Sequence, residues 1–94
     1  MIEMKTYEKK AELLKALAHP HRLCILRGLL ENGCNVSKIQ ECLNLPQSTI
    51  STHLSRLRAS GIVEGERRGT EVCYRVSNED VGNIIRLLFS SYIG

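Results

Sequence analysis

Apolar residues along the chain follow two kinds of spacing, one typical of helices and one typical of strands. Apolar residues recur at intervals of three and four in five stretches, which predicts helices there. These stretches are residues 6–18, 20–31, 36–43, 46–60 and 78–93. Before the last one, residues 62–67 and 71–76 alternate like half-buried strands around the turn Arg68-Gly69-Thr70. The pattern predicts a mainly α fold with one β-hairpin, in the order α-α-α-α-β-β-α.

Residues with capping chemistry lie at the ends of these elements. Thr6 and Asn35 are placed to cap the first and third helices, and Pro20 fits the first turn of the second. Ser77 is placed to cap the last helix, with an acidic residue three positions on as its partner in a capping box. Gly61 follows the last apolar residue of the fourth helix, where a glycine commonly ends a helix.

The fourth predicted helix has one face of short polar side chains. The residues on that face are Gln47, Ser48, Ser51, Thr52 and Ser55. Ile50, Leu54 and Leu57 have the spacing of a buried stripe on another face, and His53 lies toward that apolar side. Short hydroxyls and an amide let a helix approach and hydrogen-bond another surface, which suits a helix in the major groove of DNA. A serine-rich solvated face is the alternative interpretation.

The elements around this helix predict a winged helix-turn-helix. A short helix, the turn at residues 44–46 and the polar helix have the helix-turn-helix arrangement, with residues 46–60 as recognition helix. The hairpin at residues 62–76 then places Arg67 and Arg68 near its tip, and Arg56 lies in the same unit. A basic wing can reach along the DNA backbone or into the minor groove. Two solvated turn charges are the alternative for the arginine pair.

The last predicted helix is more apolar than a terminal helix on so small a domain requires. We predict that residues 78–93 pack against a second copy of the chain, joined by residues 6–18. The alternative is that the last helix folds back onto its own domain. The predicted interface residues are Leu14, Ile84, Leu87, Leu88 and Tyr92.

Size, charge and composition limit the classes of protein that fit. The 94 residues predict a single domain over 1–94, and a net charge of +3 does not by itself indicate nucleic-acid binding. There is no apolar run that could span a bilayer and no signal-peptide core, so we expect a cytoplasmic protein without a membrane partner. Ser51 and His53 point apart on a helix, and no phosphate-binding glycine loop is present, so we predict no enzymatic activity.

The four cysteines form no CxxC pair, and a cytoplasmic chain keeps them reduced. Cys24, on a polar helix side, and Cys34, in a loop, are candidate sensor thiols because such thiols can ionise and react. Ordinary packed cysteines are the alternative. His19, His21 and Cys24 have the spacing H-x-H-x-x-C, but Pro20 between the histidines argues against their convergence. We therefore predict no metal site and no cofactor.

Three motifs, LAHPHRLCIL, QSTISTHLSRLRASGIV and RRGTEVCYRV, together with the closing helix, resemble the ArsR/SmtB family of small bacterial and archaeal winged-helix repressors. The resemblance covers about Leu13 to Tyr92. It implies a homodimer that binds double-stranded DNA at a dyad-symmetric operator and is released by an inducer. The DNA contacts that it implies fall on Gln47, Ser48, Ser51 and Thr52 in the helix, and on Arg67, Arg68 and Thr70 in the wing.

The chain departs from this family at both of the family's metal sites. The positions of a ligating cysteine pair hold Asn35 and Ser37, and no histidine follows His53 to supply a site on the last helix. The inducer is therefore unknown. The leading hypothesis is a homodimeric repressor released by a small inducer or by thiol modification. The alternative is a winged-helix protein–protein interaction module that does not bind DNA, although the polar stripe and basic wing favour the repressor.

Overall fold

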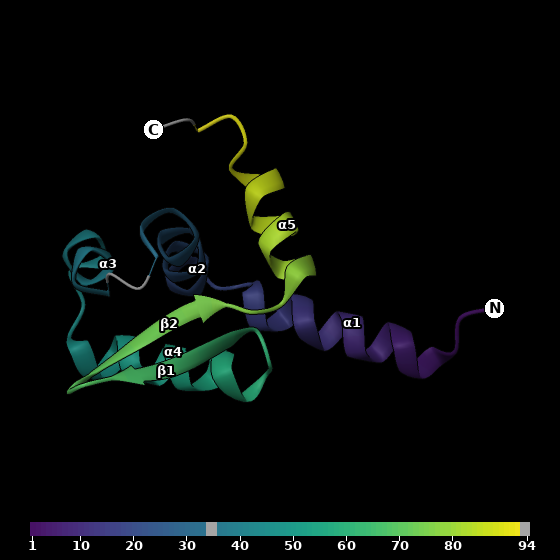
Figure 1. Ribbon diagram of the computed structural model, residues 1–94. Coiled ribbons are helices and arrows are strands. Elements are labelled where there is room, and N and C mark those ends of the chain that lie inside the picture. The colour runs from purple at the N-terminus through teal and green to yellow at the C-terminus, as the bar shows by residue number, and fades with distance from the viewer. Residues whose placement is uncertain (34–35, 93–94) are drawn as a thin grey trace.

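The computed structural model describes the chain except residues 34–35 and 93–94, and except the side chains of residues 32, 36–38 and 42. Its elements are α1 (Met4–Leu17), α2 (Pro20–Asn32), α3 (Val36–Leu43), α4 (Gln47–Ala59), β1 (Val63–Arg68), β2 (Glu71–Val76) and α5 (Glu79–Leu88). This is the order that the hydrophobic pattern predicts. In Figure 1, α2, α3 and α4 gather around the hairpin, whereas α1 and α5 project from it.

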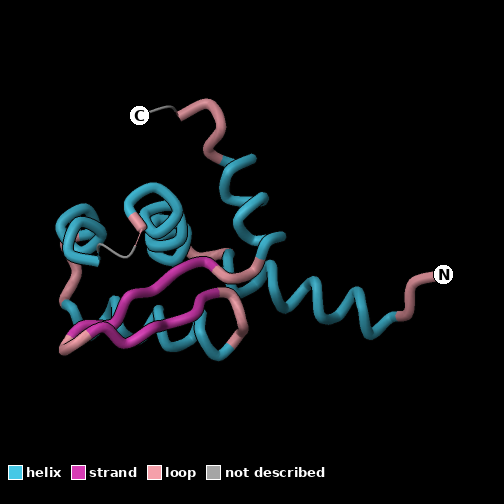
Figure 2. The backbone as a smooth tube through the Cα atoms, viewed as in Figure 1, coloured by secondary structure: helices cyan, strands magenta, loops and turns pink. Residues whose placement is uncertain are grey.

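The hairpin is a two-stranded antiparallel ribbon, visible in magenta in Figure 2. Its register runs from Val63 opposite Val76 to Arg68 opposite Glu71. Arg68 is therefore the last paired residue of β1. The predicted turn Arg68-Gly69-Thr70 is wrong, because Arg68 belongs to the strand and only Gly69 and Thr70 form the turn. Gly69 closes the shorter turn with a φ of +65°, a conformation that glycine adopts without a steric penalty.

One hydrophobic core joins all five helices to the base of the hairpin. Its buried members are Leu17, Ile25, Leu26, Leu29, Ile39, Ile50, Leu54, Leu57, Ile62, Val63, Val81 and Ile85. The stripe predicted on the fourth helix is confirmed, because Ile50, Leu54 and Leu57 are all buried. Burying a large aliphatic side chain stabilises a fold by roughly 1.5–3 kcal/mol. This stripe therefore fixes which face of α4 points outward.

The end of α4 is tied to the start of the wing. Gly61 has a φ of +74°, and its N–H donates to the carbonyl of Arg58 at 3.0 Å. The N–H of Ile62 donates to the carbonyl of Leu57 at 2.9 Å, which completes a Schellman motif. The predicted helix-ending role of Gly61 is confirmed. Since the buried Ile62 directly precedes β1, the motif sets the position of the hairpin relative to α4.

The start of α1 differs from the prediction. The helix begins at Met4, and Glu3 occupies the N-cap position without a side-chain hydrogen bond. The N–H of Thr6 donates to the carbonyl of Glu3 at 3.0 Å, so Thr6 already lies inside the first turn. The predicted cap at Thr6 is therefore wrong. Asn35, the predicted cap of α3, lies outside the described residues.

The last helix is capped by Asn78 and not by Ser77 as predicted. The Asn78 Oδ1 accepts a hydrogen bond from the N–H of Val81 at 3.1 Å. The N–H groups of Ser77 and Asn78 both donate to the carbonyl of Ile62, at 2.9 and 3.4 Å. These bonds hold the chain against the strand until Asn78, which leaves Ser77 outside the helix.

The last helix is also shorter than predicted, because α5 ends at Leu88 with Phe89 as its C-cap. Arg27 of α2 contacts the residues that follow the helix. Its guanidinium lies 4.9 Å from the centre of the Phe89 ring and donates to the carbonyl of Tyr92 at 3.1 Å. These contacts turn the segment after α5 back toward α2.

Candidate nucleic-acid interface

The polar face of α4 points into solvent. Its residues Gln47, Ser48, Ser51, Thr52 and Ser55 are all exposed, and so is Arg56 beside them. The Thr52 hydroxyl donates to the carbonyl of Ser48 at 2.9 Å, which leaves its oxygen free to accept from a partner. The serine side chains are short enough for the helix backbone to approach a surface closely, and the long side chains of Arg56 and Arg58 lie in the last turn. The structure thus brings every residue of the predicted recognition face to one outer surface.

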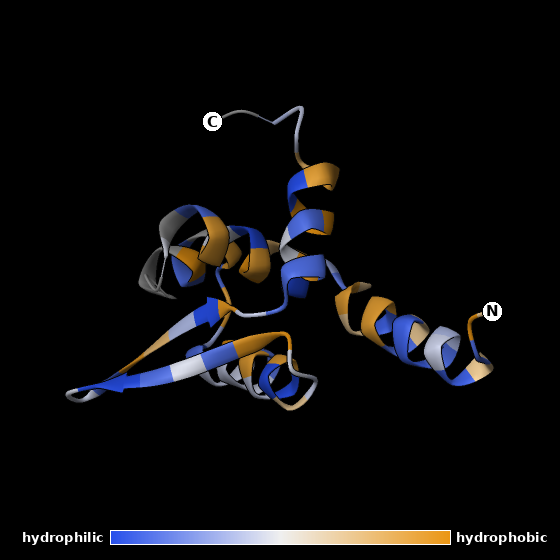
Figure 3. Ribbon diagram, turned by 45° about the vertical axis from the view of Figure 1, so that its right-hand side comes forward, coloured by the Kyte–Doolittle hydropathy of each residue, from blue (hydrophilic) through white to orange (hydrophobic). Residues whose placement is uncertain are grey.

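The wing presents arginines at its outer end. Arg67, Arg68 and Thr70 are exposed, and the hydrophilic outer part of β1 is visible in Figure 3. The Arg68 Nη2 lies 3.5 Å from the Glu66 carboxylate, whereas Arg75 and Glu64 form a tighter cross-strand pair at 2.6 Å. Exposed ion pairs contribute little to stability. Arg68 can therefore exchange Glu66 for a phosphate at small cost.

The inner side of α4 contains a buried histidine. His53 is 9% exposed, as expected from its place toward the apolar side. Its Nδ1 accepts from the Arg22 Nε at 3.3 Å, and the Arg22 Nη1 donates to the carbonyl of Ala16 at 3.1 Å. Burial, followed by the charges of His19 and Arg22, holds the pKa of His53 below the ordinary histidine value. His53 is thus a neutral ring that links α4 to α2.

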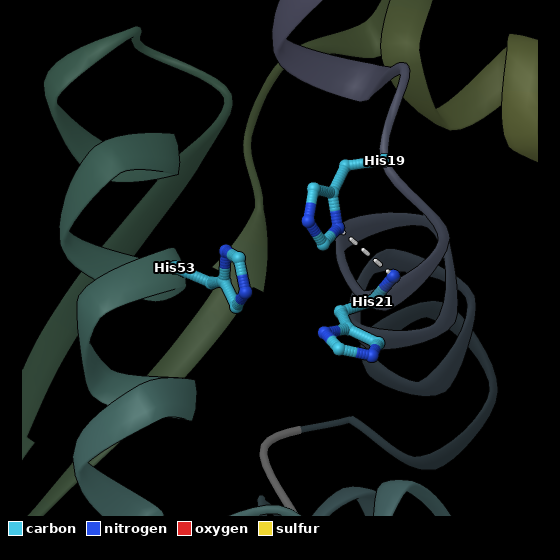
Figure 4. Close-up of side chains that lie close together, drawn as sticks. All are labelled: His19, His21 and His53. Atoms are coloured by element: carbon cyan, nitrogen blue, oxygen red, sulfur yellow. Dashed lines mark hydrogen bonds between the residues drawn. The ribbon is translucent and has the colours of Figure 1, made fainter.

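His53 is one of three histidines that meet between α2 and α4 (Figure 4). Its ring centre lies 4.8 Å from that of His19 and 5.8 Å from that of His21, and the latter two are 5.1 Å apart. Pro20 argued against convergence of His19, His21 and Cys24; the two histidine rings do meet, but the third member of the group is His53 and not Cys24. His19 is the extended N-cap of α2, so its ring turns back and its Nδ1 accepts from the His21 N–H at 3.1 Å.

Sequence reasoning missed the third member of this histidine cluster. His53 is separated from the other two by the whole of α3, so no local spacing brings it to them. The only available signal was its place on the apolar side of the recognition helix, which indicated packing and not a partner. The cluster therefore becomes visible only when α2 and α4 are packed together.

Comparison with known proteins assigns the family. The model of the arsR family of bacterial regulatory proteins matches residues 19–65, which include α2, α3, α4 and the start of β1. The chain belongs to the ArsR family. It is similar to the transcriptional repressor PagR of Bacillus anthracis, with 43% identity over 93% of this chain and 88% of PagR.

Solved structures of ArsR-type regulators have the same architecture. HlyU of Vibrio cholerae superposes with a TM-score of 0.86 and 38% identity, over 96% of this chain and 98% of HlyU. Mb0332 of Mycobacterium bovis, a homodimeric winged helix-turn-helix DNA-binding domain, superposes with a TM-score of 0.79 and 31% identity, over 97% of this chain and 86% of that one. The predicted fold class is confirmed.

The chain is accordingly a DNA-binding transcriptional regulator. ArsR-family proteins are regulators and not enzymes, and these relatives lend no support to the module that does not bind DNA. Within the described part of the chain, every helix is too short or too polar to cross a membrane.

This ArsR-family chain exposes apolar side chains on α1, on α5 and in the segment that follows α5. Leu14, Leu87, Leu88 and Tyr92 are all exposed, and orange stretches mark both helices in Figure 3. Ile84 differs, because it is half-buried and packs against the core of its own domain. The inner side of α5 thus folds back onto the domain, while its outer side stays uncovered.

The structure describes one of the two candidate sensor thiols, and it is not exposed as the residues of the polar face are. Cys24 is half-buried on α2, although the sequence placed it on a polar side. Cys73 of β2 is also half-buried. Cys34 lies outside the described residues. The reactivity of these thiols stays a prediction.

Proposed function

We propose that this ArsR-family regulator is a homodimeric repressor that binds a dyad-symmetric operator through α4 and the wing. The observation that carries the proposal is the two-sided character of α4. Its apolar side is locked into the core, and its outer side presents short polar groups along most of its length, with Arg56 and Arg58 exposed in the last turn. The first turns of a helix held in this way can enter the major groove, while the two arginines can contact phosphate.

In this proposal the first turns of α4 read the bases. Recognition helices contact base edges mainly through their N-terminal residues, and Gln47 and Ser48 open this helix. A glutamine amide can make two hydrogen bonds to adenine in the major groove. Ser51, Thr52 and Ser55 follow along the same face and would contact bases or phosphates, and Arg56 would contact phosphate.

The wing would supply contacts that position the protein without reading sequence. Arg67 and Arg68 carry positive charge at its outer end, and Thr70 adds a hydroxyl in the turn. Contacts to phosphate fix the register of a protein on DNA. The Schellman motif at Gly61 supports this role, because it holds the wing at a set distance from α4.

The second copy would cover the apolar surface of α1, α5 and the segment that follows α5. Leu14, Leu87, Leu88 and Tyr92 supply the exposed part of this surface, and Ile84 borders it. The homodimeric state of Mb0332 supports a homodimer here. A two-fold dimer places two α4 helices on one side of the duplex, with half-sites about one helical turn, roughly 34–36 Å, apart.

We further propose that the regulator represses, as PagR does, and that it acts in the cytoplasm, where operator DNA lies. Release would follow binding of a small inducer or modification of a thiol, with Cys24 and Cys34 as the candidates.

The proposal is tested by fluorescence anisotropy on labelled DNA from upstream of the protein's own gene, at about 150 mM salt. A base-shuffled duplex of equal length serves as the control. Tight binding to the natural duplex that survives excess shuffled competitor would support a sequence-specific regulator. Equal and weak binding to both duplexes would contradict this proposal for that site.

A further inference from the structure

The interface between α2 and α4 contains every histidine of the chain, since the sequence has three in total. His19 directly precedes α2, His21 lies in its first turn, and His53 faces inward from α4. One ligand atom from each residue lies within 4.8 Å of those of the other two, and the rings converge in Figure 4. His53 is buried, while His19 and His21 are half-buried, so the space between the rings is shielded on the side of α4.

We propose that His19, His21 and His53 bind one divalent transition-metal ion of the Zn²⁺ or Co²⁺ type. Neutral imidazole nitrogen is a preferred ligand of these ions. In a tetrahedral site with metal–nitrogen bonds of about 2.0–2.1 Å, two ligand nitrogens are roughly 3.4 Å apart. The present separations of up to 4.8 Å therefore have to shrink by about 1.4 Å at most, which rotation of the rings can supply. The fourth position would hold water or an added ligand.

The hydrogen bonds of His19 and His53 show that both rings must change tautomer when a metal ion binds. The Nδ1 atoms of His19 and His53 both accept hydrogen bonds, from the His21 N–H and from the Arg22 Nε. Each neutral ring therefore carries its proton on Nε2. When the metal binds at Nε2, that proton leaves to solvent and another returns at Nδ1, so the net proton count is unchanged. The two hydrogen bonds that open are weak compared with zinc binding by a protein site.

Arg22 adapts to this change without losing all of its partners. Its Nη1 also donates to the carbonyl of Ala16 at 3.1 Å, which keeps the guanidinium attached to the end of α1. The bond between Arg22 and His53 is one link between α2 and α4. A metal ion would replace it with coordinate bonds from both elements to one centre.

The site is tested by titrating Co²⁺ into untagged, reduced protein and following visible absorption. Wild type should bind one ion per chain with the bands of a tetrahedral centre. His21→Gln should weaken binding by more than the roughly 100-fold that loss of an outer-shell partner costs. This variant keeps the backbone N–H that bonds His19, so its thermal unfolding should match wild type.

Cys24→Ser is the matched control on the same helix, because it removes the thiol of the H-x-H-x-x-C spacing and leaves all three imidazoles. It should bind Co²⁺ like wild type. The proposal is overturned if wild type shows no tetrahedral bands, if His21→Gln binds as tightly as wild type, or if Cys24→Ser abolishes binding. None of these results depends on DNA, so they stand apart from the test of the regulator itself.

A consequence for regulation rests on the proposed function. Because His53 belongs to the recognition helix, we infer that metal binding and operator binding are coupled. Zn²⁺ should change operator affinity at least about 5-fold in wild type and leave it unchanged in His21→Gln. Equal affinities with and without Zn²⁺ in wild type, after a successful Co²⁺ titration, would overturn the coupling alone.

Discussion

Helices α4 and α5 each bury one apolar side, yet their outer sides have opposite chemistry. The outer side of α4 carries hydroxyls and an amide, whereas Leu87 and Leu88 on α5 are 76% and 54% exposed. A polar face stays hydrated in the free protein and can exchange that water for a partner when one arrives. Exposed leucines are unfavourable in water at all times. Helix α4 therefore suits a reversible partner, and α5 suits a permanent one.

The largest expected effect comes from placing a charge on the apolar side. Leu88→Asp should give monomers, because a carboxylate in the predicted interface would lose its hydration without a partner. Operator affinity should fall by roughly 10²–10⁴-fold, since each α4 then binds its half-site alone. Sedimentation equilibrium and anisotropy measure the two effects. Leu88→Met is the control and should remain dimeric, while an intact Leu88→Asp dimer would disprove the assignment.

A smaller effect is expected on the polar side. Gln47→Ala removes an amide from the face of α4 and should cost about 1–3 kcal/mol of specific binding, the range for one bidentate base contact. Asn83→Ala removes an exposed amide from α5 and should leave operator affinity unchanged. Both variants should remain dimeric. Wild-type affinity in Gln47→Ala would show that this residue does not read a base.

The wing should affect salt dependence more than sequence preference. Replacing Arg67 and Arg68 by alanine should reduce the slope of log affinity against log salt by about 2, because two phosphate contacts release counterions. Arg75→Ala is the control, since Arg75 is already paired with Glu64 across the strands. Titrations at several salt concentrations measure the slope. A slope that the double variant leaves unaltered would place the wing outside the interface.

The smallest expected effect is on the free energy of unfolding, and it comes from His53 on the inner side of α4. Since the pKa of His53 is lowered in the folded state, the unfolded chain binds more protons below the ordinary histidine pKa. The free energy of unfolding should therefore decrease as pH falls from that ordinary value toward the lowered one. His19, His21, Arg22 and Arg56 all add to the lowering.

Urea unfolding at several pH values, with a chelator present, tests this expectation. The comparison is between wild type and His53→Gln, whose amide oxygen can still accept from Arg22. Wild type should lose more stability than the variant in this pH window. Parallel pH profiles for the two proteins would show that His53 does not contribute.

The two sides of α4 also differ in how far sequence alone could predict them. The polar face and the end at Gly61 follow from spacing and cap chemistry within a few residues, and both were predicted. The cap at Asn78 was missed because a tertiary bond to Ile62 decides between two adjacent polar residues. The histidine cluster was missed because it needs the packing of α2 against α4. Local chemistry is readable from sequence, whereas contacts between distant elements are not.

Footprinting of wild-type protein on the DNA upstream of its gene tests the central claim most directly. Two protected half-sites related by dyad symmetry, about one helical turn or roughly 10 base pairs apart, are predicted, one for each α4 of the dimer. A single protected half-site, or uniform protection along the duplex, would contradict a homodimer that reads DNA through its two α4 helices.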